Sequence, residues 1–512
     1  MAQVNKIDSN ITGLAYAEEA SLGTLPGLPA WKRLEPNSYN DFGGELTTVA
    51  PNPINPSRQR KKGVVTDMDA SGGFNHNLTY HNLQDLLQAV FFADTRKKGR
   101  QPVTGVDEDL TDPDFYEISA TANFLVGSLI KGFNFTNAAN NGLNVITAVN
   151  TDLSVEVADG ALTTENSPPA TAFIQVVGFQ GTAGDIDVDA AGDLPALTSS
   201  TLDFTTLGLV VGQWIFVGGD ATITRFTNAA NNGFKRIRAI SANRLTLDKS
   251  VMAMVTEAST TETIRLFFGD VLRNESGTSI KRRSYHIERT LGAPDDGSPS
   301  AVQSEYLKGA IPNEFTINIP TANLVNVDFT FVAIDHLQRT GSDGPLQTSV
   351  TSPQKADVYN TSSDFSRIKM ATVSDTNEAP TPLFAFITEA SIAINNNLSP
   401  NKAVGVLGAF DVTAGTFSVS GSVTAYFGNV SAVQAVRGNA DITLDMAMVK
   451  DNTGFIIDIP LVALGDGRLN VEQDQPITLP LSMDAATAED IATGMDHTAL
   501  LTFFGYLPDV AE

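Results

Sequence analysis

The clearest alternation of apolar and polar side chains lies at residues 417–427. Its apolar positions are Phe417, Val419, Val423, Ala425 and Phe427, and its hydroxyl positions are Ser418, Ser420, Ser422 and Thr424. A period of two residues predicts a β-strand that buries one face and wets the other. The hydroxyl face would suit the wall of a wetted channel, and an ordinary solvent-facing side of a sandwich strand is the simpler alternative.

Helical spacing is scarce and is clearest at residues 82–93. The apolar positions of this segment are Leu83, Leu86, Leu87, Val90 and Phe91. Their spacing predicts an amphipathic helix that packs one face on a sheet. Residues 430–436 also carry Val at helical or strand spacing. The chain is therefore predicted to be all-β, mainly strands with one or two flanking helices.

A literal repeat stands inside the chain. The octapeptide FTNAANNG occurs at residues 135–142 and again at residues 226–233, and short apolar segments flank both copies in the same order. Each copy predicts a small β-domain of four or five short strands around an Asn-Asn-Gly turn, because Asn and Gly tolerate positive φ angles. We place these inserts at residues 112–182 and 201–270, joined by an acidic linker at residues 183–200.

A fainter duplication brackets the octapeptides. The segment around Pro56 resembles the segment around Pro400, and FTINIP at residues 315–320 resembles FIIDIP at residues 455–460. This pattern predicts two tandem β-sandwich domains, the first interrupted by the inserts. The first domain would consist of residues 1–111 and 271–345, residues 346–380 would form a linker, and residues 381–512 would form the second domain.

Composition narrows the class of protein. The 512 residues are 42% hydrophobic and 18% charged, and the formal charge is −25 with a pI near 4.5. Such a surface repels nucleic acid and anionic membranes. With no Cys in the sequence, disulfides, thiolate metal sites and cysteine nucleophiles are excluded. The N-terminus has no signal-peptide pattern, and no apolar run is long enough to span a membrane, so we expect a soluble protein made in a cytoplasm.

No catalytic constellation can be named. The five histidines, His76, His81, His286, His336 and His497, are scattered, and no metalloprotease, nucleophile-elbow or phosphate-loop motif is present. The stretch DIDVDAAGD offers alternating carboxylates at Asp185, Asp187, Asp189 and Asp193. It lacks the Gly and Glu of a calcium loop, because Ala190 and Ala196 stand there. We therefore expect no enzyme activity and assign no catalytic, cofactor-binding or metal-binding residue.

Three basic clusters interrupt the acidic background. They are Arg58, Arg60, Lys61 and Lys62; Arg96, Lys97, Lys98 and Arg100; and Lys281, Arg282 and Arg283. Basic patches on an acidic protein can pair with acidic patches of a neighbouring copy. Solvated loops beside strands are an equally good interpretation, and the absence of interleaved aromatic residues disfavours nucleic-acid binding.

Several segments resemble those of phage tail tube proteins (major tail proteins of long-tailed bacteriophages). They are EEASLGTLP from Glu18, AWKRLEPNSY from Ala30, NPSRQRKKG from Asn55, SYHIERTLG from Ser284 and SGSVTAYFGN from Ser420. The resemblance covers most of residues 10–110 and 275–510. The FTNAANNG pair resembles variable insertions that some members display on the outside.

The resemblance implies a β-sandwich with a flanking helix, whose sheets join those of neighbours around a central channel. Rings of six such folds would stack into the tail tube of the virion, through which DNA is ejected. A chain with two copies of the fold would form a homotrimer with pseudo-sixfold symmetry, and a hexamer is the alternative. Implied partners are the chain itself, the tape measure protein, the tail terminator and distal tail proteins, and passing genomic DNA without specific binding, with no membrane.

Two other classes remain open from the sequence. A β-sandwich adhesin or surface-layer protein would also contain tandem sandwiches with acidic loops, and a secretion signal would favour it. A carbohydrate-active enzyme would show paired carboxylates amid clustered Trp and Tyr, whereas this chain has only two Trp. Excision of about residues 112–269 should leave polymerisation intact if the inserts only decorate the outside.

Overall fold

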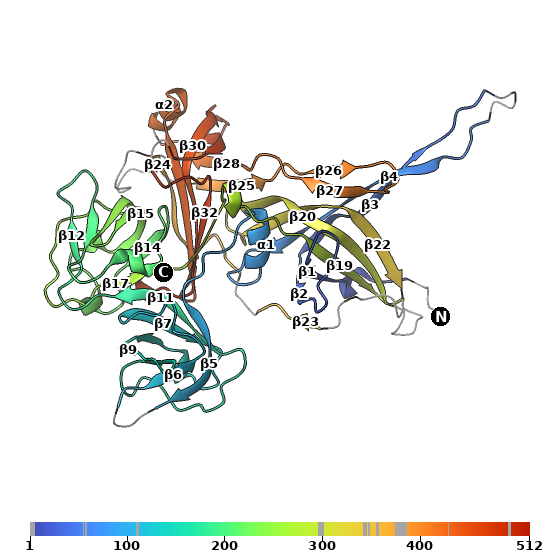
Figure 1. The fold of residues 1–512 in the computed structure, drawn as a ribbon. Coiled ribbons are helices and arrows are strands. Elements are labelled where there is room, and N and C mark those ends of the chain that lie inside the picture. Colours follow the sequence, from blue (N-terminus) through green and yellow to red (C-terminus); the bar gives the residue numbers. More distant parts are fainter. Residues whose placement is uncertain are drawn as a thin grey trace. The chain divides into compact units, whose positions relative to one another are not determined.

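The computed structural model confirms a mainly β protein (Figure 1). It describes residues 6–54, 56, 59–108, 112–294, 302–340, 346, 349–354, 358–373, 387–428, 430–489 and 493–511. Contacts divide the chain into two compact units. Unit 1 consists of residues 1–93, 275–361 and 389–423, and unit 2 consists of residues 94–274, 362–388 and 424–512. The two α-helices found in the described ranges are α1 (Gln84–Val90) and α2 (Ser431–Arg437).

Unit 1 contains two layers of strands that share one long strand, β20 (Gln303–Ile319). The first layer adds β1 (Gly13–Glu18), β2 (Trp31–Leu34), β19 (Tyr285–Gly292), β22 (Asp335–Thr340) and β23 (Val350–Thr351). The second layer adds β3 (Ser38–Val49), β4 (Val64–Asn77), β21 (Asn326–Ala333) and β25 (Ile387–Asn395). A small ribbon, β26 (Ser399–Lys402) with β27 (Ala409–Thr413), completes the unit.

The helix predicted at residues 82–93 is confirmed as α1. Its buried side chains are Leu86, Leu87, Ala89 and Val90. Asp85 lies in the first turn, where a negative charge stabilises the helix dipole. The side chains of Leu83 and Phe91 are also buried, so the apolar stripe seen in the sequence is the face that contacts the core.

The second tube sheet, in unit 2, is centred on β30 (Thr453–Asp466). Its other strands are β18 (Asp270–Arg273), β24 (Phe365–Thr372), β29 (Ile442–Lys450), β31 (Thr478–Ala486) and β32 (Leu500–Phe504). The strand predicted at residues 417–427 is β28 (Ser418–Tyr426), and α2 follows it directly.

Strand order supports the duplication but changes its register. Each copy runs strand, helix, hairpin and further strand: β4, α1, β19, β20 and β21 in one, and β28, α2, β29, β30 and β31 in the other. β20 changes partner from β19 to β21 after Ala310, and β30 begins to pair with β31 at Leu461. FTINIP lies after this change and FIIDIP before it, so their equivalence is wrong. Both are aliphatic strands with two faces, which makes their letters similar.

The remainder of unit 2 is a 13-stranded sheet system that contains both FTNAANNG copies. Its first strands are β5 (Arg100–Asp107), β6 (Phe115–Ile118), β7 (Ser128–Phe133), β8 (Leu143–Val145), β9 (Ala148–Val149), β10 (Ser154–Glu156) and β11 (Phe173–Gln180). Its later strands are β12 (Asp187–Asp189), β13 (Ala196–Thr198), β14 (Trp214–Val217), β15 (Gly233–Ser241), β16 (Arg244–Ser250) and β17 (Arg265–Phe267). The 3-10 helices of the chain are η1 (Ser9–Ile11), η2 (Ala139–Asn141), η3 (Phe204–Leu207), η4 (Thr222–Thr224), η5 (Ala229–Asn231), η6 (Gly277–Ser279) and η8 (Asp509–Ala511).

The stretches predicted as linkers are not plain linkers. Residues 183–200 contain β12 and β13, which pair with each other and with β16. Ile186 and Val188 are buried between the acidic residues, so this segment alternates like a strand and contributes to the core. Residues 346–380 contain β23 and β24.

Candidate channel-facing and assembly surfaces

A ladder of amide and carboxylate side chains crosses the partly exposed face of the second layer in unit 1. The Asn75 amide on β4 donates to Oδ1 of Asn326 (3.1 Å) and Oδ1 of Asp328 (2.8 Å) on β21. The Asn318 amide on β20 donates to Oδ1 of Asn326 (3.1 Å) and Oδ2 of Asp328 (2.7 Å). Further hydrogen bonds extend the ladder to Asn37 and Ser391. Cross-strand pairs of this kind stabilise the sheet and keep its outer face polar.

The other face of the same strands is the core. Phe74, Val327, Phe329 and Ile317 are buried and alternate along the chain with the ladder residues. Phe74 stacks on Phe329 with ring centroids 5.2 Å apart. The sequence NVDFTFVA of β21 shows this alternation directly, so the ladder could have been found by the same reasoning that found β28.

The two-faced strand predicted at residues 417–427 is confirmed in β28. Ser418, Ser420 and Ser422 are exposed, while Val419 and Val423 are buried. β31 has the same pattern, with exposed Ser482 and Asp484 between buried leucine and methionine side chains. Both tube domains therefore present a strand face made of hydroxyl, amide and carboxylate groups.

Cationic side chains are segregated from these polar faces. The strands β3, β4, β21, β25, β28 and β31 contain no Lys or Arg, and neither does the half of β20 that pairs with β21. Other strands do contain them. These are β2, β19 and β22 in the first layer of unit 1, and β18, β24 and β29 in the same sheet of unit 2 as β31. A face without cations offers no partner to a phosphate group.

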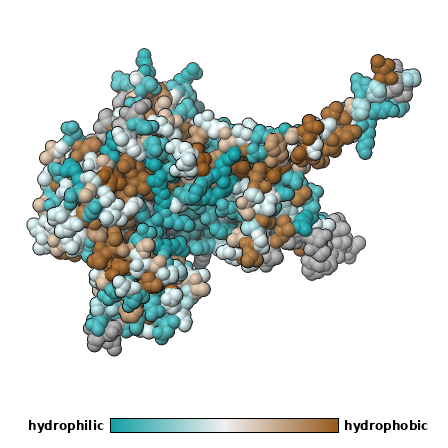
Figure 2. All heavy atoms as spheres, viewed as in Figure 1, coloured by the Kyte–Doolittle hydropathy of each residue, from teal (hydrophilic) through white to brown (hydrophobic). Residues whose placement is uncertain are grey.

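Two hairpins of unit 1 expose apolar side chains. β3 and β4 form a long two-stranded ribbon in which Leu46 is opposite Met68 and Val49 is opposite Val64. Leu46, Val49 and Val64 are 53%, 57% and 62% exposed, and hydrophobic colour follows the ribbon in Figure 2. In the second hairpin, Val404 and Leu407 of the loop between β26 and β27 and Phe410 of β27 are exposed. Ribbons of two strands are marginally stable alone, and apolar patches of this kind mark interaction surfaces.

The three basic clusters differ in how their side chains are bonded within the fold. In the first, Arg60, Lys61 and Lys62 are exposed in the loop between β3 and β4, and Arg58 lies outside the described residues. In the second, Lys98 is buried and donates through Nζ to the carbonyl of Gly208 at 2.5 Å. Burial lowers the pKa of Lys98 to about 8. Its neighbour Arg100 stacks over the Phe173 ring at 3.4 Å, so this cluster stabilises unit 2 internally.

The third basic cluster is also bonded within the fold. Arg282 donates to the carbonyl of Val412 at 2.8 Å, and Arg283 donates to the carbonyl of Ala93 at 2.9 Å. Lys281 donates its backbone amide to the carbonyl of Phe92 at 2.7 Å. Lys281 and Arg282 are nevertheless exposed, as are Arg96, Lys97 and Arg100 of the second cluster. The first cluster differs from both in lying in the loop of a hairpin.

The repeated octapeptide builds the same turn twice, around a glutamate that the sequence did not reveal. In the first copy, Glu165 accepts hydrogen bonds from the backbone amides of Thr136 (3.1 Å) and Asn137 (3.3 Å) and from the Asn140 amide (3.0 Å). Asn141 exchanges two hydrogen bonds of 3.0 Å with the backbone of Phe135. These side chains therefore bond to groups of the turn that would otherwise lack a hydrogen-bond partner.

The second copy repeats these contacts with Glu257. This carboxylate accepts from the amides of Thr227 (2.8 Å) and Asn228 (3.2 Å) and from the Asn231 side chain (2.7 Å). Asn232 exchanges hydrogen bonds of 3.0 Å and 2.8 Å with the backbone of Phe226. The glutamates follow their octapeptides at slightly different spacings, which is why the repeat in the sequence does not extend to them.

The positive φ angles predicted for these turns are mostly absent. Gly233 has a φ of 92°, but Gly142 has a φ of −71°, and the asparagines of both turns lie outside the positive region. The asparagines are therefore required for their side-chain hydrogen bonds. A shared positive φ does occur upstream, at Gly127 (88°) and Gly212 (87°), the glycines that end the flanking Val-Gly segments.

The acidic stretch at residues 185–193 uses its carboxylates within the fold. Asp185 accepts hydrogen bonds from Ser199, Ser200 and Thr201, Asp187 accepts from Ser259, and Asp189 pairs with Arg244 at 2.6 Å. The carboxylates have separate protein partners. Across the described residues, no three His, Cys, Asp or Glu side chains are grouped so that they could hold a metal ion.

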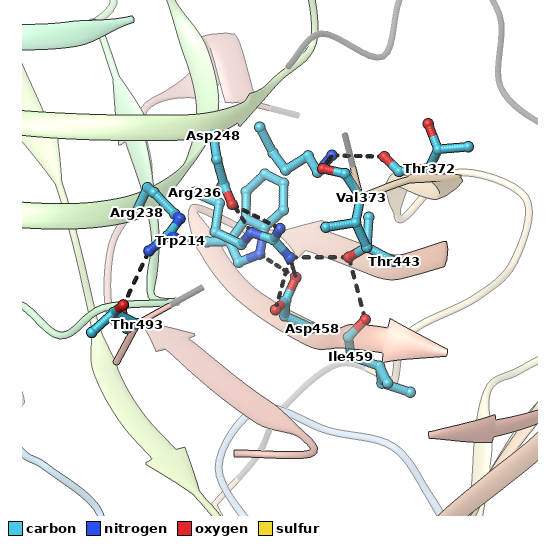
Figure 3. Close-up of polar contacts among 11 residues, drawn as sticks. Trp214, Arg236, Arg238, Asp248, Thr372, Val373, Thr443, Asp458, Ile459 and Thr493 are labelled. Carbon is cyan, nitrogen blue, oxygen red and sulfur yellow. Dashed lines mark hydrogen bonds and ion pairs between the residues drawn. The ribbon is translucent and has the colours of Figure 1, made fainter. Parts of the chain in front are cut away.

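The second insert is fixed to the tube sheet of unit 2 by a buried ion pair (Figure 3). Arg236 on β15 donates Nε and Nη2 to the two oxygens of Asp248, each at 3.0 Å. Its Nη1 donates to Asp458 on β30 at 3.1 Å and to Thr443 at 3.0 Å. Trp214 donates Nε1 to the same Asp458 oxygen at 2.9 Å. Asp458 is the acidic residue of the FIIDIP segment. It holds the second insert on the tube sheet, a role that the sequence repeat did not indicate.

An apolar contact accompanies the ion pair. It joins insert residues Leu129, Val177, Trp214, Phe216, Phe234 and Phe267 to tube residues Ala447, Val449, Ile456, Phe504, Leu507 and Ala511. In the first copy, the position corresponding to Arg236 by the octapeptide spacing is Val145. The second copy alone has acquired the charged anchor.

Burial controls the electrostatics of this anchor. Arg236 and Asp458 are 1% and 0% exposed. Burial raises the pKa of Asp458 to about 6, although Arg236 and the Trp214 hydrogen bond act against that rise. The net pKa of Arg236 is raised, because the attraction of Asp248 and Asp458 outweighs the cost of burying its charge. Arg236 therefore stays cationic.

The five histidines do not form a site. His286 lies 2.5 Å from a carboxylate oxygen of Glu19, and burial lowers the pKa of His76 and of His336. Burial, followed by the nearby charge of Arg273, lowers the pKa of His497 to about 3. His81 contacts the ring of Tyr80.

The duplicated, two-faced β-fold places the chain among β-structural proteins. A family model described as phage tail tube protein matches it twice, over residues 9–261 and residues 226–485. The matches cover most of the chain, so the chain belongs to the phage tail tube protein family.

Two other comparisons add little. Among solved structures, the chain is similar to the phage phi92 endosialidase at 10% identity and a TM-score of 0.13, over 77% of this chain and 69% of that chain. A TM-score this low does not indicate a shared fold. The search of curated proteins gave no match.

Family membership makes the chain a structural protein of a phage tail, located in the virion. This result favours the tail protein over the adhesin or surface-layer alternative. Helices long and apolar enough to cross a membrane are not found among the described residues.

Proposed function

We propose that the chain is the subunit of the tail tube, and that it polymerises as stacked rings around the channel through which DNA leaves the virion. The observation that carries this proposal is the absence of cations from one set of strands. The polar faces of β4, β21, β25, β28, β31 and the half of β20 that pairs with β21 expose amides, hydroxyls and carboxylates without a single Lys or Arg. Each phosphate neutralised by a cation adds affinity, so a wall without cations lets DNA slide.

The exposed hairpins support polymerisation. A chain that exposes Leu46, Val49 and Val64 on a long ribbon gains free energy when another molecule covers them, on the order of 25 cal/mol per Å² of apolar surface removed from water. Heterologous contacts that close by rotation form rings, and contacts along an axis form an open filament.

The duplicated tube fold sets the expected stoichiometry. Three chains would supply six folds, so the proposed ring is a homotrimer with pseudo-sixfold symmetry, and a hexamer of chains would double that number. Proposed partners are the tape measure protein inside the tube and the terminator and distal tail proteins at its ends. Synthesis in the host cytoplasm belongs to the same proposal.

Electron microscopy of the purified chain tests the proposal. Rings or tubes with a central hole wide enough for duplex DNA are expected, and averaged end views should show three equal subunits. A monodisperse monomer that never polymerises, even when tail initiator complexes are added, would contradict a tube subunit.

A further inference from the structure

Each tube domain carries a hairpin on the N-terminal side of its helix. Hairpin 1 is formed by β3 and β4 and precedes α1. Hairpin 2 is the β26–β27 ribbon, which lies between β25 and β28 and precedes α2. Both belong to unit 1, and Figure 1 shows hairpin 2 in orange beside the base of hairpin 1 in blue.

Within the chain, hairpin 2 lies on hairpin 1 through a specific contact. Lys402 of β26 bonds to Asp67 and, at 2.6 Å, to Asp69, both on β4. The two charges of Lys402 and Asp67 are about one-third exposed, so solvent screens them only partly. Ala409 of β27 donates to the carbonyl of Ile334 at 3.3 Å, which fixes the ribbon against the sheet.

Each hairpin also carries charged side chains that take no part in this contact. Hairpin 1 exposes Arg60, Lys61 and Lys62 in its loop, and hairpin 2 carries Asp411 on β27. Among the described residues, none forms an ion pair with these four side chains. Exposed apolar side chains accompany them, Val49 and Val64 on hairpin 1 and Leu407 and Phe410 on hairpin 2. Hairpin 1 thus presents cations and apolar groups, and hairpin 2 presents apolar groups and an anion.

We propose that hairpin 1 of one chain docks on hairpin 2 of a second copy, with Arg60, Lys61 and Lys62 facing Asp411. This proposal rests on the proposed function, because it supplies the contact that closes a ring. In a ring of duplicated chains, every domain neighbours one domain of its own chain and one of another chain. The contact of hairpin 2 on hairpin 1 within a chain is then the template for the contact of hairpin 1 on hairpin 2 between chains. Such a heterologous contact forms a closed ring when the rotation from one chain to the next is a whole-number fraction of a full turn.

A cysteine pair tests this docking in the full-length chain, which has no cysteine of its own. Lys61→Cys with Asp411→Cys should form disulfides between chains in assembled material after mild oxidation. A non-reducing gel should then show dimers and trimers, and the ladder should stop at the number of chains in the closed ring. Arg60→Cys and Lys62→Cys, each with Asp411→Cys, sample the neighbouring loop positions.

The matched control is Asp69→Cys with Lys402→Cys. Within one chain the Lys402 ammonium reaches the Asp69 carboxylate, so a bismaleimide with a short spacer, applied to this pair and to the test pairs alike, should cross-link it without any band larger than the monomer. If rings or tubes form and the control cross-links, but all three test pairs stay monomeric, the docking is wrong while the tube function stands. If the unsubstituted chain forms no rings or tubes at all, the proposed function fails and the docking fails with it.

Charge reversal gives a second readout. Asp411→Lys should raise the concentration needed for assembly by about tenfold or more, because it places like charges together. Adding Lys61→Glu and Lys62→Glu to it should restore assembly. Asp159→Lys, at an exposed position in the first insert, makes the same change of charge and should leave assembly unchanged. Equal assembly by the Asp411→Lys and Asp159→Lys variants would overturn the docking.

Discussion

Side-chain amides and carboxylates, more than backbone angles, define the repeated turns. Glu165 and Glu257 each accept two backbone amides and one asparagine side chain, and Asn141 and Asn232 close the same ring of hydrogen bonds. Hydrogen bonds to a charged acceptor are stronger than neutral ones. The repeat survives in the sequence because its asparagines each have two or more partners.

Glu257→Gln should loosen the second turn and leave the first unchanged. The amide group of Gln has a single acceptor oxygen and repels donors with its NH2 group, so it cannot accept from Thr227, Asn228 and Asn231 together. Amide hydrogen exchange at Thr227 and Asn228 should become faster, while exchange at Thr136 and Asn137 should not change. Glu165→Gln is the reciprocal control, and equal exchange at both turns in both variants would contradict the assignment.

The buried anchor of the second insert depends on Arg236. Arg236 satisfies two carboxylates at once, so its removal leaves Asp248 and Asp458 without their cation. Breaking one partner of a buried pair costs about 3–5 kcal/mol. Arg236→Met should therefore lower the free energy of unfolding of unit 2 by about that amount.

Fluorescence offers a direct measurement of that loss. Trp214 lies in the anchor, and the second tryptophan, Trp31, lies in unit 1, so Trp31→Phe leaves one reporter. Denaturant unfolding would be compared between Arg236→Met and Arg238→Met in this background. Arg238 donates to the carbonyl of Thr493 from an exposed contact and should change stability by about 1 kcal/mol or less. Equal stability of the two variants would show that the anchor contributes nothing.

The raised pKa of Asp458 predicts the pH dependence of the same anchor. A carboxyl whose pKa rises from 3.8 to about 6 on folding binds its proton more tightly in the folded state. Its contribution to stability is complete below about pH 4 and is lost as pH rises through about 6. Asp458→Asn should remove this component, so the difference in unfolding free energy between wild type and variant should shift between pH 4 and pH 6.5. A constant difference across that range would contradict the raised pKa.

At the level of whole strands, two-residue alternation separates a core face from a polar face in both tube domains. β21 and β28 show it in full, with phenylalanine or valine facing inward and amide, carboxylate or hydroxyl groups facing outward. The absence of Lys and Arg from these strands extends the pattern from hydropathy to charge. An exposed strand face is polar simply because it contacts water. The absence of cations from such a face needs a further reason, and passing DNA would supply one.

Ser420→Lys with Ser422→Lys tests that constraint. Both positions are exposed, so subunits should fold and assemble as before. If β28 faces the channel, the added cations should bind phosphate and slow DNA ejection from virions carrying the variant. Ser420→Asp with Ser422→Asp is the matched control and should leave ejection unchanged. Equal ejection rates for the Lys and Asp variants would exclude β28 from the channel wall.

At the level of the molecule, the inserts are more than decoration. Insert and tube sheet share one apolar core in unit 2, and Arg236 crosses between them. Excision of residues 112–269 would uncover Val449, Ile456 and Phe504 and would leave Asp458 buried beside no cation. The sequence-based expectation that this excision is harmless is therefore revised.

Plain excision of residues 112–269 should give an aggregating or strongly destabilised chain. Each uncovered Val, Ile or Phe loses roughly 1.5–3 kcal/mol of burial. The companion variant replaces Val449, Ile456 and Phe504 with Thr and Asp458 with Asn, which makes the uncovered face compatible with water. If the inserts lie outside the ring, this companion should be soluble and should form rings by electron microscopy. A plain excision variant as thermostable as wild type would show that the shared core is unimportant.

Much of the fold could be predicted because it depends on local periodicity. Alternation identified β28, helical spacing identified α1, and the repeats identified the duplication, since each signal lies within a few adjacent residues. Arg60, Lys61 and Lys62 of the first basic cluster are exposed, whereas Lys98 and Arg283 have partners from distant segments. Local reasoning could not separate these cases, because burial depends on which segments fold over a side chain.

The sequence by itself determined the β class and the duplications, because these follow from the order and type of neighbouring residues. Tertiary structure alone decided which carboxylate closes each FTNAANNG turn, that residues 183–200 are strands, and that Asp458 receives Arg236. The glutamate and anchor contacts join residues that are 25 to 222 positions apart in the chain. Their formation depends on how whole sheets pack, and no pattern within a single segment encodes it.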